Sequence, residues 1–175
     1  GVPTHAIDLL AEIRERDLSA VGRLTGFRIS GAAVPDHVIA DLIPYGIIPQ
    51  SGYGMTETNG HQYTLPDDDE NLIMDSSGKA CPGYEIRIFD EENPEVKMPT
   101  GQVGLLAGRG ASLMLGYFDD QMATESCFNR DGWFMTGDLG WVDENGYLRL
   151  IGRKKEIIIR GGHNINPARI EEFAM

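Results

Sequence analysis

Cysteine is scarce in this chain of 175 residues, which contains only Cys81 and Cys127. Two cysteines cannot build a disulfide scaffold, and this pair does not have the spacing of a metal-binding motif. The four histidines are equally scattered along the sequence. This usage favours a reducing compartment, so we expect a cytoplasmic protein.

Positive charge and long apolar runs are also in short supply. Lysine and arginine together number 15 against 27 aspartates and glutamates, which gives a net charge of −12 at pH 7. So acidic a chain binds a phosphate backbone poorly, which argues against nucleic acid as a partner. No apolar run approaches the length of a transmembrane helix. A small anionic ligand needs only a local cationic cluster, and Arg153, Lys154, Lys155 and Arg160 supply one.

The first 71 residues have the alternating helix and strand signals of an α/β fold. Apolar residues at helical spacing predict a helix over 5–16, and a second helix is expected from Pro35 to Leu42. Short apolar stretches predict strands over 27–30 and 47–50. The second strand is expected to lead into a loop around Tyr53, since α/β folds hold ligands at such strand ends.

From about residue 72 the pattern changes to short alternating strands separated by Gly, Asn and Asp, which predicts an antiparallel sheet or small barrel. Asn145-Gly146 predicts a hairpin turn in which both residues have positive φ. Trp133 and Trp141 are expected to anchor the core. A further strand is expected over 156–160, and a helix from Pro167. The expected strands of the sheet are Glu85–Asp90, Gln102–Gly108, Phe134–Val142 and Tyr147–Ile151. We therefore predict an α/β plus antiparallel β fold with segments 1–71, 72–151 and 152–175.

Three polar strings carry the chemistry. Residues 51–58, Ser-Gly-Tyr-Gly-Met-Thr-Glu-Thr, combine a ring, glycines, a hydroxyl and a carboxylate, the groups needed to stack a base, approach phosphates and reach Mg²⁺. Residues 132–140 add an isolated acid, and residues 152–162 add the basic cluster. Each string also has a plainer interpretation: a tight turn with an incidental acid, a turn-capping carboxylate, and a strand edge that lysines protect from aggregation.

In this order and at these separations, the three strings resemble the adenylate-forming superfamily of acyl-CoA synthetases, luciferases and peptide-synthetase adenylation domains. The resemblance spans essentially the whole chain and is strongest to fatty-acid or carboxylic-acid CoA ligases. It implies the end of a large domain, an α/β layer followed by a small β-barrel, and the start of a small C-terminal α+β domain. The implied substrates are ATP, coenzyme A and a fatty, alicyclic or aromatic acid, with Mg²⁺ as the metal. The implied products are acyl-CoA, AMP and pyrophosphate.

The resemblance assigns nucleotide contacts to the first string. Tyr53 would stack on adenine, and Gly54 would let the backbone approach the phosphates. Thr56 would contact the α-phosphate and Glu57 would bind Mg²⁺. A strip of small residues would lie beside adenine, although close packing of a helix on a strand explains such a strip equally well. This strip comprises Gly31, Ala32 and Ala33.

The second and third strings receive the remaining roles. Asp138 would accept the ribose hydroxyls, and Arg153 would close over the same sugar or the phosphates. Lys155 would be the hinge about which the small domain turns between the two half-reactions. Gly161 and Gly162 would line the passage of the coenzyme A pantetheine, where a Cβ would narrow the tunnel.

Family members are roughly three times as long as this chain, so the resemblance implies an internal piece. The family's phosphate loop and its C-terminal lysine have no match here, and we expect the chain alone to be inactive and prone to self-association. His5 and His61 are interpreted as satisfied polar groups or surface residues. Two alternatives stay open: an amino-acid adenylation domain of a peptide synthetase, and a non-catalytic adenylate-binding or interaction module.

Overall fold

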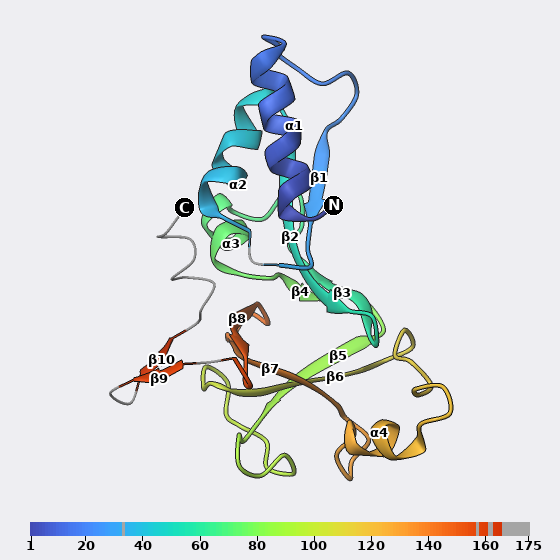
Figure 1. Ribbon diagram of the computed structural model, residues 1–175. Coiled ribbons are helices and arrows are strands. Elements are labelled where there is room, and N and C mark those ends of the chain that lie inside the picture. The colour runs from blue at the N-terminus through green and yellow to red at the C-terminus, as the bar shows by residue number, and fades with distance from the viewer. Residues whose placement is uncertain (33, 157, 161–162, 166–175) are drawn as a thin grey trace. The chain divides into compact units, whose positions relative to one another are not determined.

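The computed structural model describes residues 1–32, 34–156, 158–160 and 163–165 (Figure 1). Contacts divide the chain into two compact units. Unit 1 comprises Gly1–Met55 and Gly60–Lys79, and unit 2 comprises Thr56–Asn59 and Ala80–Met175. None of the helices in the described part is both long enough and apolar enough for a bilayer crossing.

Unit 1 contains a small sheet with helices, as the sequence predicts. Its strands follow the order β1-β2-β3-β4, and β1 pairs in parallel with β2 so that Phe27 lies opposite Pro49. The elements are α1 (Pro3–Glu15), β1 (Gly26–Ile29), α2 (Asp36–Leu42), η1 (Ile43–Tyr45), β2 (Ile48–Met55), β3 (Asn59–Tyr63), α3 (Glu70–Asp75) and β4 (Lys79–Ala80), the last residue of which belongs to unit 2.

The core of unit 1 forms where the helices cover the parallel strands. Ala6, Leu10 and Ile13 recur at helical spacing on α1, and all three are buried. They pack with Ile29 of β1 and Leu42 of α2 in one apolar cluster. Each fully buried Leu or Ile contributes about 1.5–3 kcal/mol of transfer free energy. The helical period of the sequence therefore determines which face of α1 meets the sheet.

The structure corrects the expectation for unit 1 at Tyr53 and makes it more specific at His61. The strand predicted over 47–50 continues as β2 to Met55, so Tyr53 lies on a strand and not in a loop. His61 of β3 is only 2% exposed, and burial lowers its pKa to about 4. The acidic run that begins at Asp67 supplies a helix cap, because the Asp69 carboxylate accepts a hydrogen bond from the Asn71 N–H at the start of α3.

Unit 2 is built on a four-stranded antiparallel sheet, so the choice between sheet and barrel is settled for the described residues in favour of a sheet of order β5-β6-β7-β8. Phe89, Leu105, Ala107, Trp133 and Leu139 form its core. The elements are β5 (Tyr84–Phe89), β6 (Gly104–Gly110), α4 (Gln121–Ser126), β7 (Phe134–Val142), β8 (Leu148–Arg153), β9 (Ile158–Arg160) and β10 (His163–Ile165).

Trp133 is buried in this core as expected, at 2% exposed. Trp141 is only partly buried and lies under Arg149, whose guanidinium carbon is 4.8 Å from the ring centroid. In the turn over residues 143–146 between β7 and β8, only Gly146 has positive φ, at 86°, so the expectation for Asn145 is wrong. The turn is closed instead by the Asp143 carboxylate, which accepts bonds from two backbone N–H groups downstream.

The register of β7 contains an irregularity that matters for the site. Leu105 of β6 lies opposite Leu139, and Ala107 lies opposite Met135. Thr136-Gly137-Asp138 therefore faces the single residue Leu106, and this three-residue stretch is called the β7 bulge. Gly137 has a φ of 78°, a conformation that suits glycine, and a Cβ there would meet no neighbour within 4 Å. The backbone conformation, and not space, accounts for glycine at this position.

The C-terminal predictions are only partly covered. The strand expected over 156–160 is present as β9, which starts two residues later and pairs with β10 in an antiparallel ladder. The helix expected from Pro167 lies outside the described residues. The segment boundaries at 71/72 and 151/152 stay predictions.

The buried imidazole of His61 predicts a loss of stability in mild acid. Its pKa is about 4 in the folded chain against 6.5 for a free imidazole. The unfolded chain therefore binds the proton first, and stability is complete above pH 6.5 and falls as the pH drops toward 4. Between pH 7.5 and 5 the loss in the free energy of unfolding should be about 2 kcal/mol.

Urea unfolding at both pH values measures this loss. His61→Gln should abolish this component, while His37→Gln at an exposed position should keep it. Parallel losses in wild type and His61→Gln would contradict the burial of a neutral imidazole.

The β7 bulge should be sensitive to loss of the Thr136 hydroxyl. This buried group donates to the Leu106 carbonyl at 2.8 Å and accepts from the Asp138 N–H at 3.1 Å. Thr136→Val keeps the side-chain shape but leaves both backbone groups without this partner, which should cost about 1–3 kcal/mol. Thermal or urea denaturation tests this, with Thr100→Val at an exposed position as the control. A variant as stable as wild type would show that the hydroxyl does not support the bulge.

Candidate functional site

The first string lies on a strand and the turn that follows it. Tyr53 and Gly54 belong to β2, and Thr56-Glu57-Thr58 forms the turn that joins β2 to β3. A Cβ on Gly52 would lie 2.4 Å from the Tyr63 ring. Glycine at this position is therefore explained by packing within unit 1.

Tyr53 is more enclosed than an open stacking platform. The residue is 8% exposed, and its ring centroid lies 5.5 Å from that of His61 with an interplanar angle of 86°. A base can stack on Tyr53 only where one face of the ring is uncovered. No local pattern predicts this contact, because no strand is expected over Asn59–Tyr63 and nothing in the sequence links His61 to Tyr53.

The Thr56–Thr58 turn is bound to a segment more than fifty residues later in the sequence, which we call the 112–117 strap. Ser112 Oγ donates to the Thr58 carbonyl at 2.9 Å, and the Met114 N–H donates to the Glu57 carbonyl at 2.7 Å. The buried Tyr84 of β5 also interacts with the Thr58 side chain, and burial raises the pKa of Tyr84 to about 12. The turn is thus fixed by contacts inside unit 2.

Glu57 is held by its side chain as well. The Tyr117 hydroxyl donates to Glu57 Oε1 at 2.9 Å, and this bond raises the pKa of Tyr117 to about 12. Glu57 is half-buried, whereas the neighbouring Thr56 is exposed. The strap therefore fixes the carboxylate and leaves the adjacent hydroxyl at the surface.

Glu57 can bind a divalent metal only together with ligands that the protein does not supply, such as nucleotide phosphates and water. Among the described residues there is no cluster of three or more His, Cys, Asp or Glu side chains able to hold a metal ion. Mg²⁺ is commonly bound through one or two protein carboxylates together with the phosphates of a nucleotide and water. A single oriented carboxylate is compatible with that mode and not with an all-protein cage.

Asp138 and Arg153 face each other across β7 and β8. They are direct partners in the register, and Arg153 Nε lies 2.9 Å from Asp138 Oδ1. The Asp138 side chain is 8% exposed and that of Arg153 is 48% exposed. The carboxylate is thus enclosed by the β7 bulge, while the guanidinium remains accessible to solvent. The bulge itself was not anticipated, although its Thr-Gly-Asp sequence was singled out.

The basic cluster continues in the turn that follows β8. The Lys154 N–H donates to the Gly137 carbonyl at 3.0 Å, which attaches this turn to the β7 bulge. Lys155 is exposed in the turn. Gly161 and Gly162 lie outside the described residues.

The small-residue strip follows β1 in unit 1. Gly31 and Ala32 are exposed, and Gly31 has a φ of 91°. Ala33 lies outside the described residues. Side chains of this size leave the backbone accessible at the end of the strand.

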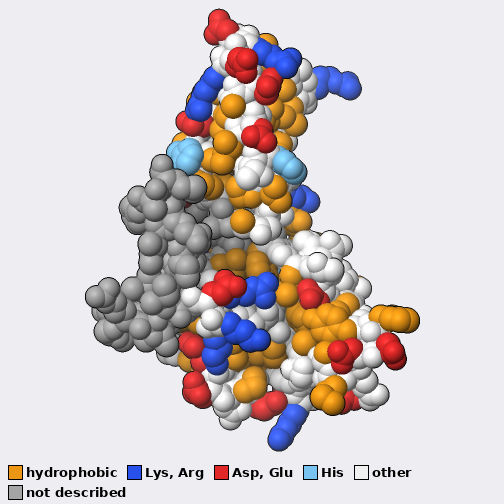
Figure 2. Space-filling view, in the orientation of Figure 1, with side chains coloured by type: hydrophobic (Ala, Val, Ile, Leu, Met, Phe, Trp, Pro, Cys, Tyr) orange, Lys and Arg blue, Asp and Glu red, His pale blue; other side chains and the backbone are white. Residues whose placement is uncertain are grey.

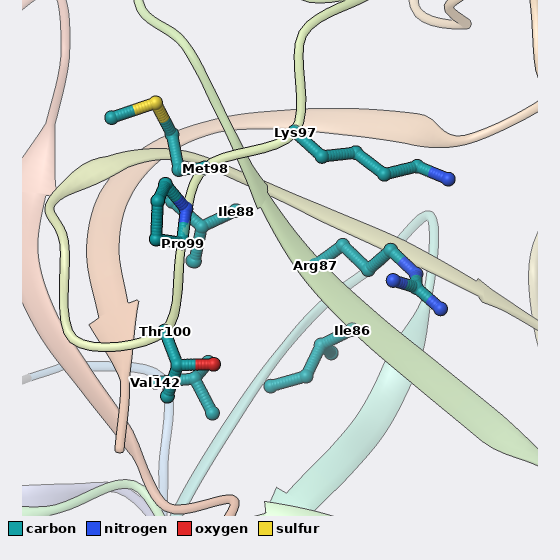
Figure 3. A pocket seen from close by; sticks show the side chains of 8 residues that line it. All are labelled: Ile86, Arg87, Ile88, Lys97, Met98, Pro99, Thr100 and Val142. Atoms are coloured by element: carbon teal, nitrogen blue, oxygen red, sulfur yellow. The ribbon is translucent and has the colours of Figure 1, made fainter. Parts of the chain in front are cut away.

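A pocket in unit 2 was not anticipated from the sequence (Figure 3). It has a volume of about 150 Å³ and lies between β5, Val142 of β7 and the segment 97–100. Ile86 and Ile88 provide apolar walls, and Arg87 and Lys97 bring cations. None of the predicted site residues lines it, so this pocket is separate from the candidate nucleotide site.

The strap and the residues that follow it expose apolar side chains. Leu115 and Phe118 are fully exposed, and Met122 of α4 is 82% exposed. Figure 2 shows hydrophobic side chains gathered on this side of unit 2. Tyr117 lies within this apolar stretch of sequence, and its ring is partly exposed.

Known proteins match the chain over most of its length. A family model described as AMP-binding enzyme matches residues 1–118. A medium-chain fatty-acid–CoA ligase of Escherichia coli is 34% identical over 175 residues, which cover 100% of this chain and 30% of the relative. An indoleacetate–CoA ligase of Aromatoleum aromaticum is 37% identical over 174 residues, covering 98% of this chain and 33% of the relative.

Solved structures agree with these relatives. The o-succinylbenzoate coenzyme A synthetase MenE from Bacillus subtilis, in complex with ATP and magnesium, matches with a TM-score of 0.85 and 29% identity over 100% of this chain and 35% of that one. ATP-bound MatB from Rhodopseudomonas palustris matches with a TM-score of 0.80 and 32% identity over 98% and 34%. The chain therefore spans about a third of the length of the proteins it matches. The family match and these relatives show that the chain belongs to the AMP-binding, adenylate-forming enzyme family.

Proposed function

We propose that the full-length protein containing this chain is an AMP-forming acyl-CoA ligase. A carboxylate oxygen of the acid attacks the α-phosphorus of ATP, and pyrophosphate leaves. The thiolate of coenzyme A then attacks the acyl carbonyl, the bond to the adenylate oxygen breaks, and AMP leaves. The observation that carries this proposal is the Asp138–Arg153 pair in the β7 bulge, in a chain whose relatives are named CoA ligases.

In this proposal Asp138 binds the ribose. A carboxylate offers about four lone-pair sites, so Asp138 can accept sugar hydroxyls while it keeps the bond to Arg153. Burial strengthens such bonds because water competes less for the acceptor. The half-exposed Arg153 side chain can extend toward the phosphates and neutralise their charge.

The Thr56–Thr58 turn handles the phosphates. The exposed Thr56 donates a hydrogen bond from its hydroxyl to an oxygen of the α-phosphate. Glu57 contributes one carboxylate to Mg²⁺, which when bound neutralises charge on the phosphates during transfer. Because positioning and electrostatic stabilisation dominate phosphoryl chemistry, a turn fixed at three points suits this task.

Adenine is assigned to unit 1. Tyr53 offers the ring on which the base stacks, once one face is uncovered. Gly54 has no side chain, so the adjoining backbone can approach the phosphates closely. The strip Gly31, Ala32 and Ala33 lines the edge of the base, where small side chains permit close approach.

The second half-reaction depends on the end of the chain. Lys155 serves as the hinge, in a turn that begins the small C-terminal domain at residues 152–155. Gly161 and Gly162 then form the passage for the coenzyme A pantetheine. Segment 72–151 belongs to the large domain in this scheme, together with the α/β layer of residues 1–71.

The acid is assigned by class only. The relatives are named for medium-chain fatty acids, indoleacetate and sulfoacetate, and MenE for o-succinylbenzoate. The acids in these names share a carboxylate and differ in the rest of the molecule. We therefore propose that the substrate is a fatty, alicyclic or aromatic carboxylic acid and that it is activated in the cytoplasm.

The ribose assignment predicts that Asp138→Asn weakens ATP binding by roughly 1–3 kcal/mol, because a charged acceptor becomes neutral. Isothermal titration of the full-length protein with ATP measures the loss. Asp131→Asn, at an exposed loop position before β7, should bind ATP as wild type does. An unchanged ATP affinity in a folded Asp138→Asn protein would exclude the ribose role.

The metal assignment predicts that Glu57→Gln slows adenylation and raises the Mg²⁺ concentration needed for half-maximal rate. The substitution keeps the shape and removes the charge, so the conversion of pre-formed acyl-adenylate to acyl-CoA should be largely spared. ATP–pyrophosphate exchange and single-turnover thioester formation measure the two steps separately. The exposed Glu144→Gln is the control. An equal loss in both steps would indicate a structural role for the turn.

The hinge assignment predicts that Lys155→Pro blocks thioester formation while adenylate formation survives, since proline fixes φ. Within the described part of the chain the Lys155 N–H donates no hydrogen bond, so proline removes none there. Rapid mixing of pre-formed acyl-adenylate with coenzyme A follows the second step. Lys155→Ala, which keeps φ free, should be close to wild type. Conversion at the wild-type rate by the proline variant would place the hinge elsewhere.

A further inference from the structure

We infer that Tyr117 is a positioning residue for Glu57: its hydroxyl orients the carboxylate that binds Mg²⁺. The inference rests on the proposed function, because it takes the metal role of Glu57 as given. The resemblance that assigns Glu57 assigns nothing to Tyr117, which is sixty residues away in the sequence.

The first support is that the strap holds Glu57 at two points. The Met114 N–H donates to its backbone carbonyl at 2.7 Å, and the Tyr117 hydroxyl donates to Oε1 at 2.9 Å. One contact fixes where the residue is, and the other fixes the direction of its terminal carboxylate. A glutamate side chain loses considerable rotamer freedom when ordered, so an existing hydrogen bond lowers the entropic cost of binding a metal.

The second support is that Tyr117 is itself anchored. Its backbone N–H donates to Thr124 Oγ1 at 2.8 Å. The Thr124 hydroxyl in turn donates to the carbonyl of Asp120, the N-cap of α4, at 2.8 Å. The tyrosine is therefore attached to a short helix and not to a free loop end. A rigid donor can orient its acceptor, whereas a mobile one would move with it.

The third support is the chemistry of the contact. The tyrosine hydroxyl donates a hydrogen bond and carries no positive charge, so it does not compete electrostatically with a cation for the carboxylate. The other oxygen, Oε2, has no hydrogen-bond partner recorded within the described part of the chain and can serve as the ligand. Partners that hydrogen-bond a ligating carboxylate typically contribute 10–100-fold in metal affinity or activity.

Tyr117→Phe in the full-length protein is the direct test, because it removes the hydroxyl and keeps the ring. With a non-hydrolysable ATP analogue bound, Mn²⁺ affinity measured by electron paramagnetic resonance should fall about 10–100-fold. The Mg²⁺ requirement of ATP–pyrophosphate exchange should rise in parallel, with the rate at saturating Mg²⁺ near that of wild type. Tyr45→Phe on η1 is the matched control and should change neither quantity.

Two more variants separate positioning from mere folding. Thr124→Val removes the acceptor of the Tyr117 N–H but leaves the Tyr117 hydroxyl in place. It should therefore lower Mn²⁺ affinity as Tyr117→Phe does, but by a smaller factor. In a Glu57→Gln background, Tyr117→Phe should cause no further loss, since there is no carboxylate left to orient.

The outcomes distinguish this inference from the proposed function. If Glu57→Gln weakens Mn²⁺ binding and Tyr117→Phe does not, the metal role stands and the positioning role is wrong. If neither variant changes Mn²⁺ binding, the metal assignment of Glu57 fails first. Equal, additive losses from the two substitutions would also overturn the inference, because independent effects mean that Tyr117 does not act through Glu57.

Discussion

The β7 bulge is the constraint on which the candidate site depends. Three residues of β7 face Leu106, and the Thr136 hydroxyl bonds both the Leu106 carbonyl and the Asp138 N–H. The bulge thereby holds Asp138 in a buried position directly opposite Arg153. Bulges commonly re-aim a side chain next to an active site. A carboxylate that must be enclosed and still reach a ligand can be placed in this way without breaking the sheet on either side.

Much of the fold followed from local signals, and the exceptions have physical causes. The strand over 134–142 was predicted with its observed bounds, and the helix expected from Pro35 to Leu42 begins one residue later, at Asp36, because period and turn residues agree there. β2 was predicted too short: the glycines that read as a loop signal lie inside a strand, where Gly52 makes room for the Tyr63 ring. The helix α4 was missed, since a six-residue helix capped by Asp120 offers too little periodicity to detect.

The candidate site was predictable only in its parts. The string around Glu57 and the pairing of Asp138 with Arg153 could be proposed because each lies in a distinctive short sequence. The strap contacts could not, since Tyr117 reaches Glu57 by tertiary folding and no pattern in either segment points to the other. The enclosure of Tyr53 by His61 was missed for the same reason. Local sequence thus indicates candidate groups, and long-range contacts determine how those groups are held.

The central claim is that the full-length protein transfers an AMP group to a carboxylate oxygen before the thioester forms. An acid labelled with ¹⁸O in both carboxylate oxygens tests this most directly, because the oxygen that attacks phosphorus remains on AMP when the thiolate displaces it. Mass spectrometry of the products should find one ¹⁸O in each AMP and one in each acyl-CoA. Label in inorganic phosphate, or AMP without label, would contradict the account.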